Sequence, residues 1–375
     1  MKVIIAGDFA PRERLAKQVE ERRFEEIFPR NLVDIIKSAD YSLANFESPI
    51  VEDGYNPITK CGPNLQCTPE AADAVKYAGF SAVTMANNHI LDYGEEGLHK
   101  SIECCKKNNI DVAGVGNNLK EAEKVLYVER RGKKLAIINC CEHEFSIATD
   151  TTAGANPLNP IRQYYSIKEA KNNADYVLVI VHGGHEHYQL PSPRMQETYR
   201  FFIEAGADAV VNHHQHCYSG YEICNNKPIF YGIGNFAFDE GVHTEKKWQE
   251  GYFVEIDFSD TITFNIFPYL QYGEKPQIEL LKTDAFTQKI ESLNTIITDH
   301  KLIKESANEY YEKSQSTIKS FIQPIRNRWI MAAQNRGLFP SFITKKWMPF
   351  LSNVVLCEAH RDKLSYFLNK NLNKK

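Results

Sequence analysis

The stretch that decides the fold runs from Asp175 to Glu186 and reads DYVLVIVHGGHE. Its first seven residues form an almost unbroken apolar run, which predicts a short strand buried on both faces. Polar residues follow at once, in the sequence HGGHE. In open α/β sheets, ligands gather outside the carboxyl ends of strands. This stretch therefore predicts an α/β fold and also the edge of the sheet at which a site lies.

The same pattern recurs along the first three quarters of the chain, where strand signals alternate with helix signals. Predicted helices cover residues 71–77, 94–108 and 195–205, and residues 252–258 with 262–267 predict a hairpin. Polar residues follow other predicted strands at Gly7-Asp8, Asn45-Phe46-Glu47, Ala86–His89, Asn212–His216 and Gly232–Phe236. The alternation indicates an α/β sandwich in which these polar clusters share one crevice.

The character of the sequence changes near Glu274-Lys275-Pro276. Beyond this point helix signals dominate, at residues 289–319 and 350–372, and few strand signals remain. We therefore predict two regions, an α/β body at residues 1–274 and an α-helical, basic C-terminal region at residues 275–375.

The overall charge hides an asymmetry. The chain has 375 residues and a net charge of -4, yet residues 318–375 contain 11 Lys and Arg, two acids and eight aromatic residues. Such a segment can bind an anionic polymer or a membrane surface. The alternative, which we prefer, is a helical appendage that docks on the acidic body through its aromatic residues.

Several features favour a cytoplasmic location. No apolar run approaches the roughly 18 residues of a transmembrane helix, and the apolar run at residues 3–6 is shorter than that of a signal peptide. The nine cysteines are odd in number and lack C-x-x-C spacing, which favours reduced, small buried residues. Peripheral membrane contact through the basic segment stays open.

Six of the twelve histidines lie between His182 and His216, beside carboxylates at predicted strand ends. On a strand, residues two apart face the same way, so His214 and His216 would share a site from which His213 points away. Alone, Asp8 could cap a helix, Asn88 could hold a turn and His182 could be a core histidine. Together, six side chains offer nitrogen and oxygen ligands for two divalent Mn, Fe or Zn ions, which suits phosphoester hydrolysis: Asp8, Glu47, Asn88, His182, His214 and His216.

A series of longer motifs resembles the CapA family, named for capsule poly-γ-glutamate biosynthesis. The resemblance covers roughly residues 1–270 and rests on Gly7-Asp8, Asn45-x-Glu47-Ser48-Pro49, Ala86-Asn87-Asn88-His89-x-x-Asp92-x-Gly94, Gly114-x-Gly116, His182-Gly183-Gly184-x-Glu186, Gly206–Val210, His213-His214-x-His216 and Gly234-Asn235-Phe236-x-Phe238-Asp239. That family is similar in fold to calcineurin-like metallophosphoesterases. The resemblance thus implies a four-layer α/β/β/α sandwich with a two-metal centre and, here, a C-terminal helical extension.

The resemblance also implies a role for each matching residue. Asp8 and His216 would bind the first metal, and Glu47 would bridge the two ions. Asn88, His182 and His214 would hold the second metal. His89 would protonate the leaving oxygen or stabilise the transition state, and Asp92 would orient His89.

Three departures from the phosphoesterase pattern argue against ordinary phosphatase activity. The first motif lacks its histidine in Asp8-Phe9-Ala10, Glu47 replaces an Asp, and the last motif reads His213-His214-Gln215-His216. CapA relatives share the first two changes. Capsule CapA proteins also typically carry a membrane anchor at the N-terminus, whereas this sequence begins directly with a predicted strand.

Further residues near the clusters are candidate contacts. Arg194 either reaches over an anionic substrate or simply begins a surface helix. His187 and Asp239 are candidates for supporting or substrate contacts. The candidate substrate-binding residues are Asn45, Glu186, His213 and Asn235.

The function expected from these observations is metal-dependent hydrolysis of a phosphoester, or of a polyglutamyl or glycan-linked substrate, in capsule or polymer synthesis. The competing hypothesis is a non-catalytic accessory component that binds metal or anionic polymer, with other polymer-synthesis proteins as partners. Nucleic-acid processing is less expected, because the body that carries the site is acidic whereas phosphate backbones attract basic grooves.

Overall fold

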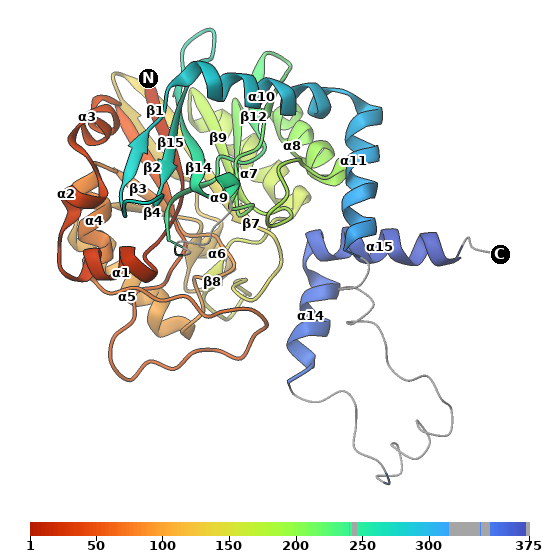
Figure 1. Ribbon diagram of the computed structural model, residues 1–375, viewed down its shortest axis with the longest axis horizontal. Coiled ribbons are helices and arrows are strands. Elements are labelled where there is room, and N and C mark those ends of the chain that lie inside the picture. The colour runs from red at the N-terminus through yellow and green to blue at the C-terminus, as the bar shows by residue number, and fades with distance from the viewer. Residues whose placement is uncertain (240, 242–245, 315–337, 339–345, 373–375) are drawn as a thin grey trace.

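Two β-sheets form the centre of the computed structural model, which describes residues 1–239, 241, 246–314, 338 and 346–372 (Figure 1). The larger sheet has the strand order β16-β15-β14-β1-β2-β3-β4, and β13 also pairs with β1. Strands β1 to β4 and β13 are parallel, whereas β14 to β16 are antiparallel to their neighbours. The strands are β1 (Lys2–Ala10), β2 (Tyr41–Phe46), β3 (Ala82–Thr84), β4 (Asp111–Ala113), β13 (Asn235–Phe238), β14 (Glu250–Asp257), β15 (Thr263–Gln271) and β16 (Ile278–Leu280).

The second sheet has the strand order β11-β12-β10-β9-β7-β6. Its four central strands are parallel, and both edge strands, β6 and β11, are antiparallel. Its strands are β6 (Leu126–Arg130), β7 (Lys133–Cys141), β9 (Tyr176–His182), β10 (Ala209–His213), β11 (Tyr221–Cys224) and β12 (Lys227–Phe230), and a separate short pair is β5 (Val115–Gly116) with β8 (Gly154–Ala155).

Helices cover the outer face of each sheet (Figure 1). The larger sheet is covered by α1 (Glu13–Glu20), α2 (Phe24–Ile27), α3 (Arg30–Ser38), α4 (Glu70–Ala78) and α5 (Gly94–Lys107). The second sheet is covered by α7 (Pro160–Asn173) and α8 (Pro193–Ala205). The remaining helices are α6 (Leu119–Ala122), α9 (Lys246–Gln249), α10 (Thr283–Thr298), α11 (His300–Lys313), α14 (Met348–Leu356) and α15 (Glu358–Leu372).

Strand alternation explains why four layers form. In β1, Val3 and Ile5 pack between the two sheets, whereas Ile4 faces the helices. In β9, Leu178 packs between the sheets and Val179 faces α7 and α8. Because successive side chains point to opposite faces, an apolar run buries both faces of its strand. The expected four-layer α/β/β/α sandwich is confirmed.

Differences from the expected elements are small. The hairpin of β14 and β15 forms, and β1 continues beyond Ala6 because Phe9 and Ala10 pair with β2 and β13. The boundary at residue 274 stays a prediction, although β16 beyond it pairs with β15. Most of the basic segment 318–375 lies outside the described residues.

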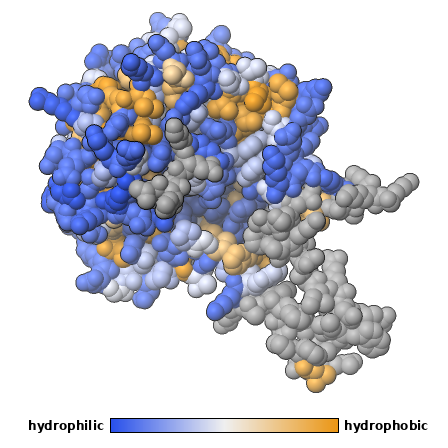
Figure 2. All heavy atoms as spheres, viewed as in Figure 1, coloured by the Kyte–Doolittle hydropathy of each residue, from blue (hydrophilic) through white to orange (hydrophobic). Residues whose placement is uncertain are grey.

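The surface in Figure 2 is mostly hydrophilic, with apolar residues in small separate groups. Scattered apolar residues of this kind are normal on a folded body. Of the helices among the described residues, none is long and apolar enough to cross a membrane. All nine cysteines are free, as expected.

Helix α15 docks on the body through Arg194. The Arg194 guanidinium lies 2.7 Å from Glu142 and 3.0 Å from Asp362 of α15. Arg194 therefore does begin a helix, α8, but its charge is used by these two carboxylates and not by a substrate. Burial raises the pKa of the Asp362 carboxyl to about 6, although Arg194 opposes the shift.

Replacing Arg194 with alanine will destabilise the fold. The variant leaves the carboxylate of Glu142, which is 3% exposed, without its cation. Removing one partner of a buried ion pair typically costs several kcal/mol, so we expect a loss of about 3 kcal/mol in the free energy of unfolding by urea. Arg30→Ala is the control, because Arg30 is exposed and its pair with Asp34 is long at 3.8 Å. Equal stabilities of the two variants would contradict the docking role.

Candidate metal centre

The carboxyl ends of neighbouring strands meet where the two sheets face each other. Asp8 of β1 lies in register with Asn45 of β2, and Glu47 follows β2 directly. In the second sheet, His182 at the end of β9 lies in register with His213 of β10. Strand pairing thus brings residues from four segments of the sequence to one place, as the strand-end pattern predicted.

A close approach between two chain segments positions Asp8. A Cβ atom on Gly7 would lie 1.8 Å from the carbonyl oxygen of Gly234, and the N–H of Asp8 donates to that same oxygen at 3.4 Å. Gly234 has φ +79°, in the left-handed region that favours glycine. Both glycines are therefore required for the path of the chain below the site.

His214 and His216 reach the site by a different route from the one expected. Strand β10 ends at His213, and the following histidines have φ 89° and φ 56°. Strand alternation therefore does not explain why both point inward. Non-glycine residues adopt left-handed backbone at a cost, and such strain is concentrated at functional sites.

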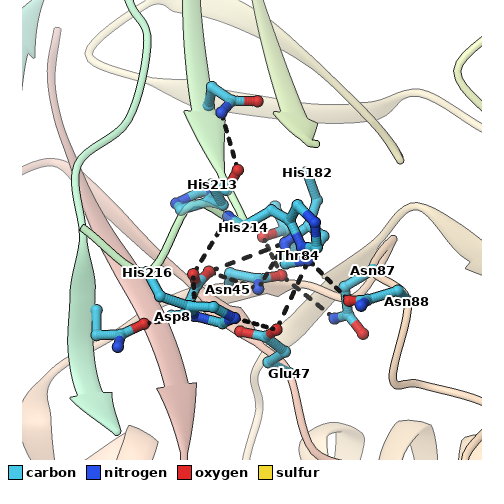
Figure 3. A network of polar contacts seen from close by, with 12 residues as sticks. Asp8, Asn45, Glu47, Thr84, Asn87, Asn88, His182, His213, His214 and His216 are labelled. Carbon is cyan, nitrogen blue, oxygen red and sulfur yellow. Dashed lines mark hydrogen bonds and ion pairs between the residues drawn. The ribbon is translucent and has the colours of Figure 1, made fainter. Parts of the chain in front are cut away.

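Five side chains form a compact cluster of buried nitrogen and oxygen atoms (Figure 3). Single ligand atoms of Glu47, His182 and His214 all lie within 4.8 Å of one another, as do those of Asp8, Glu47 and His216. His214 Nδ1 is 3.1 Å from His182 Nε2, and His216 Nε2 is 3.8 Å from Glu47 Oε1. The two groups share Glu47, so they can hold two cations with one bridging carboxylate.

Among the described residues, neither carboxylate oxygen of Glu47 has a hydrogen-bond partner, although its side chain is completely buried. Burying a carboxylate is costly unless it is paired or coordinates a metal. Imidazole nitrogens of His182 and His216 lie 3.7 Å and 3.8 Å from Glu47 Oε1, beyond hydrogen-bond distance. The orphaned oxygens and the imidazole nitrogens around them fit a divalent cation.

The pKa shifts of Glu47 and His182 also fit a bound cation. Burial and the negative charge of Asp8 raise the pKa of the Glu47 carboxyl well above its ordinary value. Burial and the neighbouring His214 lower the pKa of His182 well below its ordinary value. A neutral imidazole has the lone pair that a metal needs, and a cation would stabilise a deprotonated Glu47.

Two asparagines hold the ligands in place. Asn45 Nδ2 donates to Asp8 Oδ1 at 2.8 Å and lies 3.2 Å from His182 Nδ1. Asn88 Oδ1 lies 3.0 Å from His182 Nε2, while Asn88 Nδ2 donates to Glu144. Asn88 therefore contacts the cluster at His182, and its role as a ligand stays a prediction, whereas Asn45 supports the cluster from beneath.

Three of the candidate substrate-binding residues are buried next to the cluster. Asn45, His213 and Asn235 are buried, and His213 Nε2 lies 3.0 Å from the carbonyl oxygen of Ala6. Asn235 Oδ1 lies 2.9 Å from His216 Nδ1. These residues contact the cluster and the backbone, and substrate binding by them stays a prediction.

The other candidate contacts, Glu186, His187 and Asp239, differ in whether they lie close to the cluster. Glu186 is half exposed, and its carboxylate lies within 4.8 Å of ligand atoms of His214 and His216. His187 packs on Trp248, with ring centroids 3.9 Å apart. Asp239 pairs with Arg14 and is not available to the site. Of the four candidate substrate-binding residues, Glu186 has a position from which it can contact a substrate.

His89 and Asp92 form a pair next to the metal centre. His89 Nδ1 lies 2.7 Å from Asp92 Oδ2, which is the contact expected of an orienting carboxylate. Burial lowers the pKa of His89, although its hydrogen bond to Asp92 opposes the shift. The ring therefore favours its neutral form, with Nε2 as the nitrogen left for a reacting group.

Lys60 is a functional candidate that sequence reasoning missed. Its Nζ pairs with Asp92 and lies 3.0 Å from His89 Nδ1, in a side chain that is 2% exposed. It belongs to the irregular segment between β2 and α4, in which no periodicity or motif singles out a lysine. Lys60 places a buried positive charge behind the His89–Asp92 pair.

A cavity of about 290 Å³ opens above these residues. The body contributes Asn88, His89, Glu186 and His214 to its wall. Helices α14 and α15 contribute Phe350, Asn353, His360 and Lys363. The C-terminal helices therefore form part of the wall of the cavity, which the sequence did not predict.

Comparisons with known proteins agree with the sequence pattern. A family model described as "Bacterial capsule synthesis protein PGA_cap" matches residues 2–240. "Capsule biosynthesis protein CapA" of Bacillus anthracis is 33% identical over 236 residues, which cover 61% of this chain and 57% of that relative. "PGA biosynthesis protein CapA" of Bacillus subtilis is 32% identical over 239 residues, which cover 63% of this chain and 62% of that relative. The matched part of the chain thus spans less than two thirds of the length of either relative.

Among solved structures, a novel phosphatase of Mycoplasma pneumoniae resembles the chain with a TM-score of 0.45 and 16% identity. The match covers 76% of this chain and 98% of that one.

Proposed function

We propose that this chain is a metal-dependent hydrolase acting in capsule, poly-γ-glutamate or polysaccharide synthesis. The chain belongs to the bacterial capsule synthesis protein (PGA_cap) family. The two relatives above are named for capsule and PGA biosynthesis. The observation that carries the proposal is the buried carboxylate of Glu47, whose oxygens have no partner and are shared by two groups of ligand atoms.

In this proposal the chain holds two divalent Mn, Fe or Zn ions. Asp8 and His216 would hold the first ion, Asn88, His182 and His214 would hold the second, and Glu47 would contribute to both. The donors are nitrogen and oxygen with no thiolate, which suits these metals. Bound divalent cations lower the pKa of water and polarise the oxygens of a scissile phosphoester or acyl bond.

The residues around the centre would transfer the proton, position the proton-transfer group and bind the substrate. Asp92 holds His89 through Nδ1, so His89 exchanges a proton with the reacting oxygen through Nε2. Lys60 holds Asp92 in place through its ion pair. Lys363 of α15, which lines the cavity, offers a positive charge to a phosphoester or an anionic polymer. A location in the cytoplasm, and contact with other polymer-synthesis proteins, stay predictions.

Metal content tests the proposal first. We expect protein purified without added metal to carry about two equivalents of Mn, Fe or Zn at the metal centre, and a His214→Ala/His216→Ala variant to lose them. Elemental analysis of the folded proteins measures both. His99→Ala is the control, because His99 is exposed on α5 and contacts only Asn117 in the described structure.

A hydrolysis screen of the loaded protein, from phosphoesters to γ-glutamyl peptides, then tests turnover. Wild-type protein that binds no metal after reconstitution with each ion would overturn the hydrolase. Protein that binds two metals and hydrolyses none of these substrates would instead support the non-catalytic accessory role.

A further inference from the structure

A cysteine, a histidine and a glutamate meet outside the metal centre, where α15 lies against the segment that follows β7. Single ligand atoms of Glu144, Cys357 and His360 all lie within 4.8 Å of one another. Cys357 Sγ donates to Glu144 Oε1 at 3.4 Å. We propose that these three residues form a second, separate cation site, here named the C-terminal site, which binds Zn²⁺ or a similar thiophilic divalent cation.

The local sequence explains why the two C-terminal ligands face the same way. Cys357 directly precedes α15, its backbone is extended with ψ 125°, and its carbonyl accepts from the N–H of Arg361 at 2.9 Å, so it caps the start of the helix. His360 is three residues later. The side chain of a capping residue lies close to the third residue of the helix. The spacing therefore turns the thiol and the imidazole toward Glu144 together.

Contacts other than the ligands themselves hold this arrangement. His143 contacts Glu358 through its backbone N–H at 2.8 Å and through Nδ1 at 2.7 Å. Glu142 accepts from the N–H of Ala359 at 3.2 Å. Together with the Arg194–Asp362 pair, these contacts fix the first turns of α15 on the body. A site that is positioned before the cation arrives loses little entropy on binding.

An unpartnered atom is the second observation that points to a ligand. His360 Nδ1 is buried and has no hydrogen-bond partner in the part of the chain that the structure describes. Leaving a buried polar atom unpaired costs about 1–3 kcal/mol, and a bound cation removes that cost. The sulfur, nitrogen and oxygen donors are those of zinc sites, in which three protein ligands leave a fourth position open. Glu144 and His360 both line the cavity, so that position faces it.

Glu144 connects the C-terminal site to the metal centre. Its Oε2 accepts from Asn88 Nδ2 at 3.0 Å, and Asn88 Oδ1 contacts His182. A cation at the C-terminal site would therefore fix both α15, as a wall of the cavity, and the orientation of Asn88. The site does not depend on the proposed hydrolase, because the metal centre contains no thiolate and its ligands are different residues.

Cobalt titration tests the C-terminal site on its own. The full chain is stripped with a chelator and titrated with Co²⁺ alone. Thiolate ligation gives an intense near-ultraviolet charge-transfer band, which we expect to saturate at about one equivalent of a thiolate-bound ion. The band should persist in the His214→Ala/His216→Ala variant, which removes ligands of the metal centre, and disappear in Cys357→Ser.

Two further variants make the result specific. Cys61→Ser is the matched control, because Cys61 lies nearby and accepts from Asn353 at 3.4 Å, and its band should be unchanged. His360→Gln, at a partly buried position, should weaken cobalt binding at least tenfold, and it replaces Cys357→Ser as the test if that variant fails to fold. No band in wild type, or a band that survives both Cys357→Ser and His360→Gln, would overturn the proposal.

Discussion

Replacing Glu47 with glutamine will abolish the stabilisation that cations give to the fold through the metal centre. A ligand that binds only the folded state at 1,000 times its Kd adds about 4 kcal/mol to the free energy of unfolding. Glu47 belongs to both ligand groups of the centre, so its neutral amide weakens both positions at once. We expect the variant to gain about 1 kcal/mol or less under the same conditions.

Without metal, Glu47→Gln should no longer be the less stable of the two proteins. In wild type, the two oxygens of Glu47 are buried without partners, and burying an unpaired carboxylate costs more than burying an amide. Metal-free Glu47→Gln should therefore be at least as stable as metal-free wild type. Because cations at such centres supply several kcal/mol of transition-state stabilisation, hydrolysis should fall by about 10³-fold or more.

Glu222→Gln is the matched control for this experiment. Glu222 is also buried, but Arg200 and Tyr231 donate to its carboxylate and it lies far from the site in β11. This variant should be less stable than wild type and yet keep the full gain from added metal. Thermal and urea unfolding with and without cation measure both variants. An unchanged metal-dependent gain in Glu47→Gln would remove Glu47 from the centre.

The sequence predicted the sandwich and the place of the site because both depend on local patterns. Apolar runs such as residues 176–181 identify buried strands, and polar residues directly after them lie at one edge of a parallel sheet. Asp8, Glu47 and His182 were found in this way. Their mutual distances then follow from strand pairing, which brings the ends of β1, β2 and β9 together.

The residues that sequence reasoning missed or misplaced depend on irregular backbone and on tertiary contacts. His214 and His216 converge through left-handed backbone and not through strand alternation. Lys60 reaches His89 from a loop without periodicity. Buried positions such as those of Asn45 and Asn235 match the motifs of a site without showing which side of the ligands they occupy.

The contribution of the C-terminal helices was not predictable for a related reason. Their charged side chains look like those of any exposed helix until their partners are known. Arg194 and Asp362 are 168 positions apart, and only the fold shows that they pair. The same contacts bring Cys357 and His360 to Glu144, which no sequence motif had singled out.

Replacing His89 with alanine will remove turnover and leave the metals bound. His89 lies beside the centre without belonging to either ligand group, and Asp92 fixes its Nδ1 at 2.7 Å. Losing a positioned proton-transfer group typically lowers kcat by about 10²- to 10⁴-fold. The ion pair of Lys60 with Asp92 remains in the variant, so the melting temperature should change little. Elemental analysis, kcat and thermal unfolding measure these three quantities on one preparation.

The comparison with the ligand variant separates catalysis from binding. His214→Ala/His216→Ala should lose the two ions of the metal centre and the activity together, whereas His89→Ala should lose activity alone, and the exposed control His99→Ala should lose neither. An accessory protein that only binds metal or polymer has no need of a histidine held by a buried carboxylate and a buried lysine. If His89→Ala retains both its metals and full hydrolysis, His89 has no part in the reaction. If it also leaves polymer production in cells unchanged while wild type shows no hydrolysis, the accessory role replaces the enzyme.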